Sequence, residues 1–266
     1  MRRRITAGGC FRNAGLVVAL TSLLASACGG LSTSTTSMSP SPSPPVVYGF
    51  AGLNASESVD QVEGLRATIT WTVEPVIVPG YSVSTWIAFA VATPGHGESN
   101  RIAQIGWIET DPGRAHLFWE WGTSTADSHK QIGKAVELGL PLNVEVDLDR
   151  SGELTFLADA VAVGTARIPW VPTAIGAFAE THTTTEYLPG SSSLPEVLSG
   201  FQEKVAGTWM PYNGHVLTTS PQFRVNVSSD NSVLIWDVRQ PRYGSLVRLS
   251  SGRHGREDAI APMSHG

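Results

Sequence analysis

The chain has 266 residues, of which 41% are hydrophobic and only 15% are charged, and its formal net charge is −5 at pH 7. This is enough apolar material for one sizeable core, and too little charge for a coiled coil or an acidic disordered protein. An acidic chain is not expected to bind nucleic acid, which calls for a basic patch. Two cysteines cannot build a disulfide scaffold or a four-thiolate metal site, and we expect neither a metal nor a cofactor.

The first 28 residues have the pattern of an export signal. Three arginines at positions 2 to 4 precede an apolar run from Ala14 to Ala25. This run is too short to cross a bilayer of roughly 30 Å as a helix. The segment Leu24-Ala25-Ser26-Ala27-Cys28 then resembles a bacterial lipobox, in which small residues precede a cysteine that is acylated and becomes the new N-terminus. The third residue before the cysteine is usually leucine and here is Ala25, so ordinary signal-peptidase cleavage is the alternative.

These features predict four regions. Residues 1–27 form a cleaved lipoprotein signal peptide, and Cys28 anchors the exported protein to the outer face of the cell membrane. Residues 28–45 are rich in Ser, Thr and Pro, so they cannot bury enough surface to fold and form a linker. A globular domain follows over 46–238, and the tail at 239–266 is expected to be disordered. Without the four arginines of the leader, the 18 basic residues fall to 14 against 23 acidic ones, a net charge of −9.

The globular domain shows an alternation of apolar and polar residues with period two, which is typical of half-buried strands. The clearest case is Ala67-Thr68-Ile69-Thr70-Trp71-Thr72-Val73, with its threonines on one face. Turn residues such as Pro79-Gly80 and Arg150-Ser151-Gly152 separate the runs. Further strands are expected at 84–91, 102–109, 116–121, 142–149, 153–158, 174–179, 222–227 and 233–238. The sequence therefore predicts an all-β, antiparallel sandwich or jelly roll.

Four segments in a row resemble the glutamic peptidase (eqolisin) family and the related neprosin-type domains. They are Thr-Trp-Thr-Val-Glu-Pro at 70–75, Thr-Trp-Ile-Ala-Phe-Ala-Val at 85–91, Ile-Ala-Gln-Ile-Gly-Trp at 102–107 and Phe-Trp-Glu-Trp at 118–121. A weaker fifth match is Ala179-Glu180-Thr181-His182. The likeness runs over roughly residues 66–187. It implies a concanavalin-like β-sandwich and the chemistry of a peptidase that works at acidic pH.

The resemblance also implies a catalytic pair, in which Gln104 is the first member. The second is Glu180, with Glu186 left open as the alternative. In such a peptidase the carboxylate acts as a general base on water and then as an acid to the leaving amine, while the glutamine amide stabilises the oxyanion. The family also has an acid near the position of Ala90, where this chain has none. Because of this departure, the alternative is that the protein is a degenerate, inactive relative of these peptidases.

The ligand of such a site would be a peptide or a glycan, and five residues are expected to contact it: Trp86, Trp119, Glu120, Trp121 and His182. In a strand, Glu120 points to the face opposite Trp119 and Trp121. Glu120 is therefore either a groove residue or an acid on the surface of the sheet. The tryptophans are either ligand platforms or part of the core.

Two other functions are considered. A non-catalytic surface lipoprotein would use Trp119 and Trp121 to stack on sugars or to grip a peptide. A retaining glucanase is suggested by Glu145-Val146-Asp147-Leu148-Asp149, which superficially resembles a Glu-x-Asp-x-Glu strand. However, residues i and i+4 lie about 13 Å apart in a straight strand, and retaining chemistry needs carboxyl groups about 5–5.5 Å apart. We expect this segment to be the acidic face of a hairpin.

Overall fold

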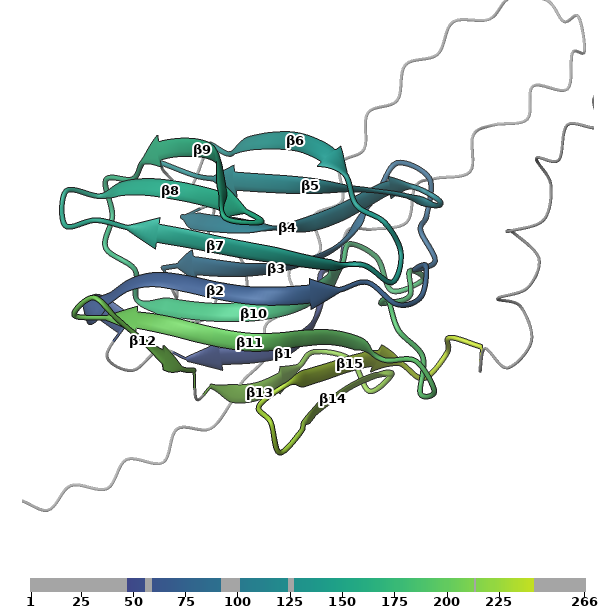
Figure 1. Cartoon of the computed structure of the whole chain (residues 1–266). Helices are drawn as coiled ribbons and strands as arrows, with labels where there is room; N and C mark the ends of the chain where they lie inside the picture. Colours follow the sequence, from purple (N-terminus) through teal and green to yellow (C-terminus); the bar gives the residue numbers. More distant parts are fainter. Residues whose placement is uncertain (1–46, 56–58, 92–100, 124–126, 213, 242–266) are drawn as a thin grey trace, which may run out of the picture. The chain divides into compact units, whose positions relative to one another are not determined.

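The fold is an antiparallel β-sandwich, which confirms the predicted class. The structure is a computed structural model, and it describes residues 47–55, 59–91, 101–123, 127–212 and 214–241. These residues form two sheets that pack face to face (Figure 1). The seven-stranded sheet, here sheet A, has the order β13-β1-β10-β3-β4-β5-β6. The eight-stranded sheet, sheet B, has the order β14-β15-β11-β2-β7-β8-β9, with β12 paired to β11.

The strand bounds are as follows. Sheet A contains β1 (Gly49–Ala55), β3 (Val83–Ala90), β4 (Ile102–Asp111), β5 (Arg114–Trp121), β6 (His129–Ala135), β10 (Ala174–Thr181) and β13 (His215–Thr218). Sheet B contains β2 (Val62–Thr70), β7 (Pro141–Leu148), β8 (Glu153–Ala158), β9 (Val161–Arg167), β11 (Glu196–Val205), β12 (Thr208–Pro211), β14 (Phe223–Val227) and β15 (Val233–Asp237). A short 3-10 turn, η1 (Val59–Gln61), precedes β2. Among the described residues, no helix has the length and apolar character to cross a membrane.

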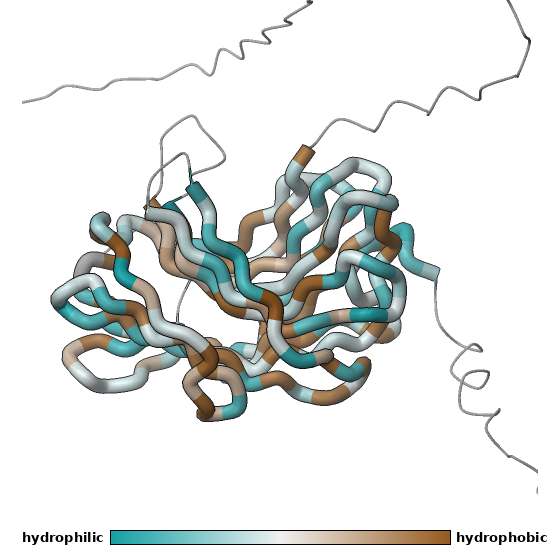
Figure 2. The backbone as a smooth tube through the Cα atoms, turned by 90° about the horizontal axis from the view of Figure 1, so that it is seen from above, coloured by the Kyte–Doolittle hydropathy of each residue, from teal (hydrophilic) through white to brown (hydrophobic). Residues whose placement is uncertain are grey.

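The main core lies between the two sheets, because alternation turns one face of each strand inward. Figure 2 shows hydrophobic and hydrophilic residues interleaved along the backbone. Trp107 and Phe89 of sheet A and Phe156 and Leu65 of sheet B are all fully buried. Trp71, which follows β2, packs on Trp107 with ring centroids 5.3 Å apart. Each fully buried side chain of this size contributes roughly 1.5–3 kcal/mol of transfer free energy.

Among the buried carboxyl groups, those of two glutamates on inward-facing strand positions have strongly raised pKa values. Glu196 of β11 accepts hydrogen bonds from Thr85 Oγ1 and Trp107 Nε1, both at 2.9 Å, and so joins sheet B to sheet A. Its complete burial raises its pKa to about 8. Glu109 is also fully buried and accepts the Gly113 N–H at 2.7 Å. Burial, offset in part by that hydrogen bond and reinforced by the charge of Glu74, raises the pKa of Glu109 to about 7.

The packed chain continues past residue 238 into the segment that the composition assigned to the tail. Arg239 forms an ion pair with the buried Asp237 at 2.6 Å and donates to the backbone carbonyls of Thr184 and Glu186. Gln240 Nε2 donates to the carbonyl of Leu188 at 3.0 Å. Residues 242–266 of the tail, the leader, Cys28 and the linker lie outside the described residues.

Gly106 of β4 makes the central contact between β3 and β4 possible. A Cβ at this position would stand 1.9 Å from the carbonyl oxygen of Thr85 and 2.7 Å from the Cα of Trp86. We expect Gly106→Ala to destabilise the domain by about 1–3 kcal/mol, because the backbones of two central strands must separate. The midpoint of thermal unfolding should fall by several degrees.

A matched control is Gly133→Ala on β6 of the same sheet. There a Cβ would meet only side-chain atoms, the Cδ2 of Leu117 at 3.1 Å and the Cζ3 of Trp119 at 3.2 Å, both of which can shift by a few tenths of an ångström. We expect this variant to lower the unfolding temperature much less than Gly106→Ala does. Equal effects of the two substitutions, measured by circular dichroism, would contradict the special role of Gly106.

Candidate active site

The outer face of sheet A, turned away from sheet B, carries a second hydrophobic cluster. It consists of Trp86, Ala88, Ile108, Phe118 and Phe178, all buried, with Phe50 and Ile102 packed against them. The cluster is unusual because the outward face of an antiparallel sheet is ordinarily polar. The polar residues set into an apolar face therefore stand out as a candidate site.

Gln104 and Glu180 both belong to this outer face. The strand β3 lies between β4, which carries Gln104, and β10, which carries Glu180. Gln104 is paired with Ala88 and Glu180 with Ser84, so the two residues are two strands apart and offset by four residues along β3. Trp86 occupies the position between those two partners. Gln104 and Glu180 therefore flank the indole of Trp86 diagonally.

The carboxyl group of Glu180 is desolvated but supplied with donors. Its Oε2 accepts from Trp86 Nε1 at 2.8 Å and from Ser84 Oγ at 3.3 Å. Burial raises the pKa of Glu180 above its ordinary range, and His182, the two hydrogen bonds and Lys130 partly offset this rise. A carboxyl group in such surroundings suits proton transfer.

The side chain of Gln104 is held by Glu120, which lies directly opposite it on β5. Gln104 Nε2 donates to Glu120 Oε2 at 3.0 Å, and Lys130 Nζ lies 3.3 Å from the same oxygen. Ser128 Oγ also donates to the Glu120 carboxylate. Gln104 Oε1 is buried and has no hydrogen-bond partner among the described residues. Lys130 acts on the Glu180 carboxyl as well, so one cation influences both carboxyl groups.

His182 follows β10 directly and borders the site beyond Glu180. Its Nδ1 lies 2.5 Å from the carbonyl oxygen of Ser82 and 3.3 Å from Ser82 Oγ. Tyr48 packs edge-on against the imidazole, with ring centroids 4.9 Å apart. These contacts fix the ring beside Glu180, where the imidazole lowers the pKa of the Glu180 carboxyl and so opposes the effect of burial.

Glu186, the alternative to Glu180, has a different environment in the turn after β10. Its carboxylate accepts the backbone N–H groups of His182 at 2.6 Å, Thr183 at 2.9 Å and Val78 at 3.4 Å. These bonds satisfy the orphan donors of a tight turn and tie it to the segment before β3. Its surroundings indicate a structural role and leave Glu180 as the better member of the pair.

Trp119 and Trp121 do not reach this face. Strand alternation turns them toward sheet B, where both pack against the main core. Trp121 lies 6.2 Å from Phe156 of β8, and Trp119 covers the backbone of Gly164 on β9. The structure therefore brings together Trp86, Gln104, Glu120, Glu180 and His182, and separates the two other tryptophans from them.

Two polar residues of the site were not anticipated from the sequence. Ser84 could have been found, since it lies two residues before Trp86 in a predicted strand and so shares its face. Lys130 lies on β6, an edge strand whose residues are nearly all exposed and show no apolar alternation. Within the described residues, no three His, Cys, Asp or Glu side chains gather in a group that could hold a metal ion.

Comparison with known proteins supports the fold at low sequence identity. The sequence matches no family model and no curated protein. SCP-B, a member of the eqolisin family of peptidases solved with the tripeptide Ala-Ile-His, superposes with a TM-score of 0.51 at 11% identity, covering 74% of this chain and 100% of that chain. Scytalido-glutamic peptidase with a peptide-based transition-state analogue gives 0.50 at 13% identity, with the same coverage. The protein thus has the β-sandwich fold of the glutamic peptidases. Fold alone does not define activity.

Proposed function

We propose that this protein is an endopeptidase of the glutamic type that acts at acidic pH, with Gln104 and Glu180 as its catalytic pair. The observation that carries the proposal is their placement on one face of sheet A around Trp86, with the Glu180 carboxyl buried and held by two donors. Eqolisin structures that hold a tripeptide or a peptide-based analogue share the fold, which supports the same class of ligand.

The proposed reaction uses the chemistry of these side chains. Ionised Glu180 takes a proton from a water molecule, whose oxygen attacks the peptide carbonyl carbon. Glu180 then returns the proton to the leaving amine. Gln104 and Glu180 lie two strands and four residues apart, roughly 16 Å between their backbones, so the proposal requires the scissile peptide bond to lie over Trp86, between the two side chains. One N–H of Gln104 is bound to Glu120, and in the proposed reaction the other donates to the oxyanion of the tetrahedral intermediate. Glu120 and Lys130 serve as positioning residues for the amide.

The test is hydrolysis of a peptide library by the purified full chain between pH 3 and pH 7. New peptide termini, identified by mass spectrometry, are expected with the wild type and absent with Glu180→Gln. Failure of the wild type to cleave any peptide in this range would reject the activity.

A binding-only function is the second candidate. It is favoured by one observation: Ala90, where the family resemblance implies an acid, is paired with Ile102 and Ala174, and none of the three carries a carboxylate. In that case the wild type would bind peptides of the library without cleaving them, and binding would weaken in Trp86→Ala. Retention of peptide by both proteins would contradict this alternative.

We also propose that the protein is exported and held at the outer face of the membrane by a lipid on Cys28. The lipobox-like leader and the Ser/Thr/Pro-rich linker support this proposal. Cys28→Ser is expected to move the protein from the membrane fraction to the soluble fraction, as followed by immunoblotting. Persistence of the variant in washed membranes would show that Cys28 is not the anchor.

The hydrogen bond from Trp86 to Glu180 should influence the pH dependence of the proposed activity. Trp86→Phe keeps a ring but removes the N–H that stabilises the Glu180 carboxylate. The pKa of Glu180 should rise further, so the acidic limb of kcat/KM should move to higher pH by about one to two units. Ser84→Ala, which removes a longer bond, should move the limb in the same direction by less. If the acidic limb of kcat/KM does not move in Trp86→Phe, this tryptophan does not influence the pKa of Glu180.

A further inference from the structure

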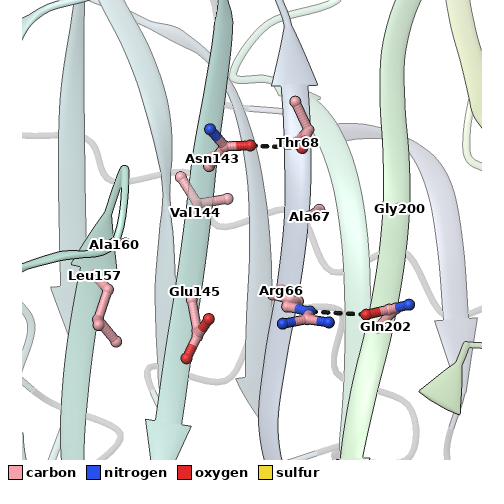
Figure 3. Close-up of a pocket in the computed structure, with 10 residues that line it drawn as sticks. All are labelled: Arg66, Ala67, Thr68, Asn143, Val144, Glu145, Leu157, Ala160, Gly200 and Gln202. Carbon is pink, nitrogen blue, oxygen red and sulfur yellow. Dashed lines mark hydrogen bonds between the residues drawn. The ribbon is translucent and has the colours of Figure 1, made fainter. Parts of the chain in front are cut away.

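A groove lies across the outer face of sheet B, the side of the sandwich opposite the candidate active site. Its volume is about 370 Å³, and residues of β2, β7, β8 and β11 line it (Figure 3). The side chains that define it are Arg66, Thr68, Asn143, Glu145, Leu157 and Gln202. None of them belongs to the candidate active site.

Strand register arranges four of these side chains in one row across the sheet. Leu157 is paired with Glu145, Glu145 with Arg66, and Arg66 with Gln202. Arg66 Nε donates to Gln202 Oε1 at 2.7 Å, as Figure 3 shows. Two residues along the strands, on the same face, Thr68 Oγ1 donates to Asn143 Oδ1 at 2.8 Å. Planar amide, guanidinium and carboxyl groups thus stand side by side on one surface.

An irregularity in β11 opens one wall of the groove. The pairing of β11 with β2 shifts between Ser199 and Gln202. Gly200 adopts a positive φ of 60°, and no atom lies within 4 Å of the place where its Cβ would be. Phe201 turns into the core and packs on Tyr212 with ring centroids 4.3 Å apart. The bulge therefore removes a side chain from the groove and keeps the space above Gly200 open.

The charges around the groove are balanced. Lys204 forms an ion pair with Asp147 at 3.2 Å. Arg66 and Lys204 both lie over the ring of Trp209 on β12, at 4.3 Å and 5.4 Å from its centroid. This balance leaves no strong field to attract an ionic ligand. The four strands that line the groove all have neighbours on both sides, so no free strand edge is present for an extended peptide.

We propose that this groove is a binding site for a neutral oligosaccharide. Arg66, Asn143, Glu145 and Gln202 combine donors and acceptors, as the paired hydroxyl groups of a sugar require. Leu157, Ala160 and Gly200 supply apolar surface for the C–H faces of the sugar rings. An open groove that crosses several strands suits a chain of sugars. The site would hold the protein on a polysaccharide independently of the peptide chemistry on sheet A.

The experiment measures binding of cellohexaose, xylohexaose, chitohexaose and mannohexaose, all neutral, to the full chain, purified in detergent, by isothermal titration calorimetry. At least one of these probes is expected to bind the wild type. Gln202→Ala and Glu145→Ala should each lower the affinity at least tenfold. Thermal unfolding near the wild-type temperature would confirm that both variants are folded.

Two controls separate this site from others. Glu153→Gln changes an exposed acid outside the groove and should leave affinity unchanged, as should Glu180→Gln on sheet A. Binding of none of the four probes would overturn the proposal. Wild-type affinity in both groove variants would overturn it as well, and so would loss of binding in Glu180→Gln, because it would assign the sugar to the other sheet.

Discussion

Glu180→Gln is expected to lower kcat/KM for peptide hydrolysis by about 10²–10⁴-fold, the contribution of a positioned general base and acid. The amide cannot take a proton from water at any pH in the working range. Its oxygen can still accept the indole N–H of Trp86, so the packing of the site should persist. The substitution therefore removes the chemistry with little change in shape, and KM is expected to change far less than kcat.

The comparison variants distinguish the roles within the site. Gln104→Ala should lower kcat/KM by about 10²–10³-fold, because the donor to the oxyanion is lost. Glu120→Gln should lower kcat/KM by less, because Glu120 affects the reaction only by positioning Gln104. Glu137→Gln, an exposed acid outside the site, is the matched control and should keep full activity. Rates are measured with a fluorogenic peptide, and a Glu180→Gln enzyme that retains most of the wild-type rate would remove Glu180 from the mechanism.

The faces of this sandwich are predictable from the sequence because alternation is local. The segment from His116 to Trp121 shows this directly: its pattern alone places Glu120 opposite Trp119 and Trp121, and the structure has them so. What alternation does not reveal is which face meets the other sheet. The tryptophans turn to sheet B, and Glu120 lies on the face of Gln104, so the aromatic pair belongs to the core.

The partners of each site residue depend on strand order, which a single sequence does not encode in a local pattern. The strand β10 lies between β1 and β3, more than 80 residues away along the chain, and only this placement puts Glu180 beside Trp86 and Ser84. The strand β1 itself was not predicted. It contains two glycines, and a Cβ at Gly52 would stand 1.9 Å from the carbonyl oxygen of Ala177. Because glycine has no side chain, its positions in β1 allow close backbone packing and do not contribute to the apolar–polar alternation from which a strand is predicted.

Glu196→Gln is expected to change how stability depends on pH. The pKa of Glu196 is raised from 4.5 to about 8 in the folded protein, so between these values the folded state holds a proton that the unfolded chain has lost. The free energy of unfolding must then fall as pH rises, by up to about 1.4 kcal/mol per pH unit for one group. Glu109 adds a slope of the same sign between pH 4.5 and about 7. Both groups make the domain more stable in acid than at neutral pH.

Glutamine at position 196 can accept the Trp107 N–H through its oxygen and donate to Thr85 Oγ1, so the bridge between the sheets should survive. Its amide does not titrate. Between pH 4.5 and pH 8, the free energy of unfolding of the variant should rise by roughly 2–5 kcal/mol relative to that of the wild type. The fall of stability with pH that Glu109 causes should remain. Urea unfolding at pH 4.5, 6 and 8 measures this, with Glu137→Gln as the neutral control. Parallel curves for wild type and Glu196→Gln would mean that the core carboxyl is not protonated. A domain built around neutral carboxyl groups keeps its fold in the acid range, where the proposed peptidase would work.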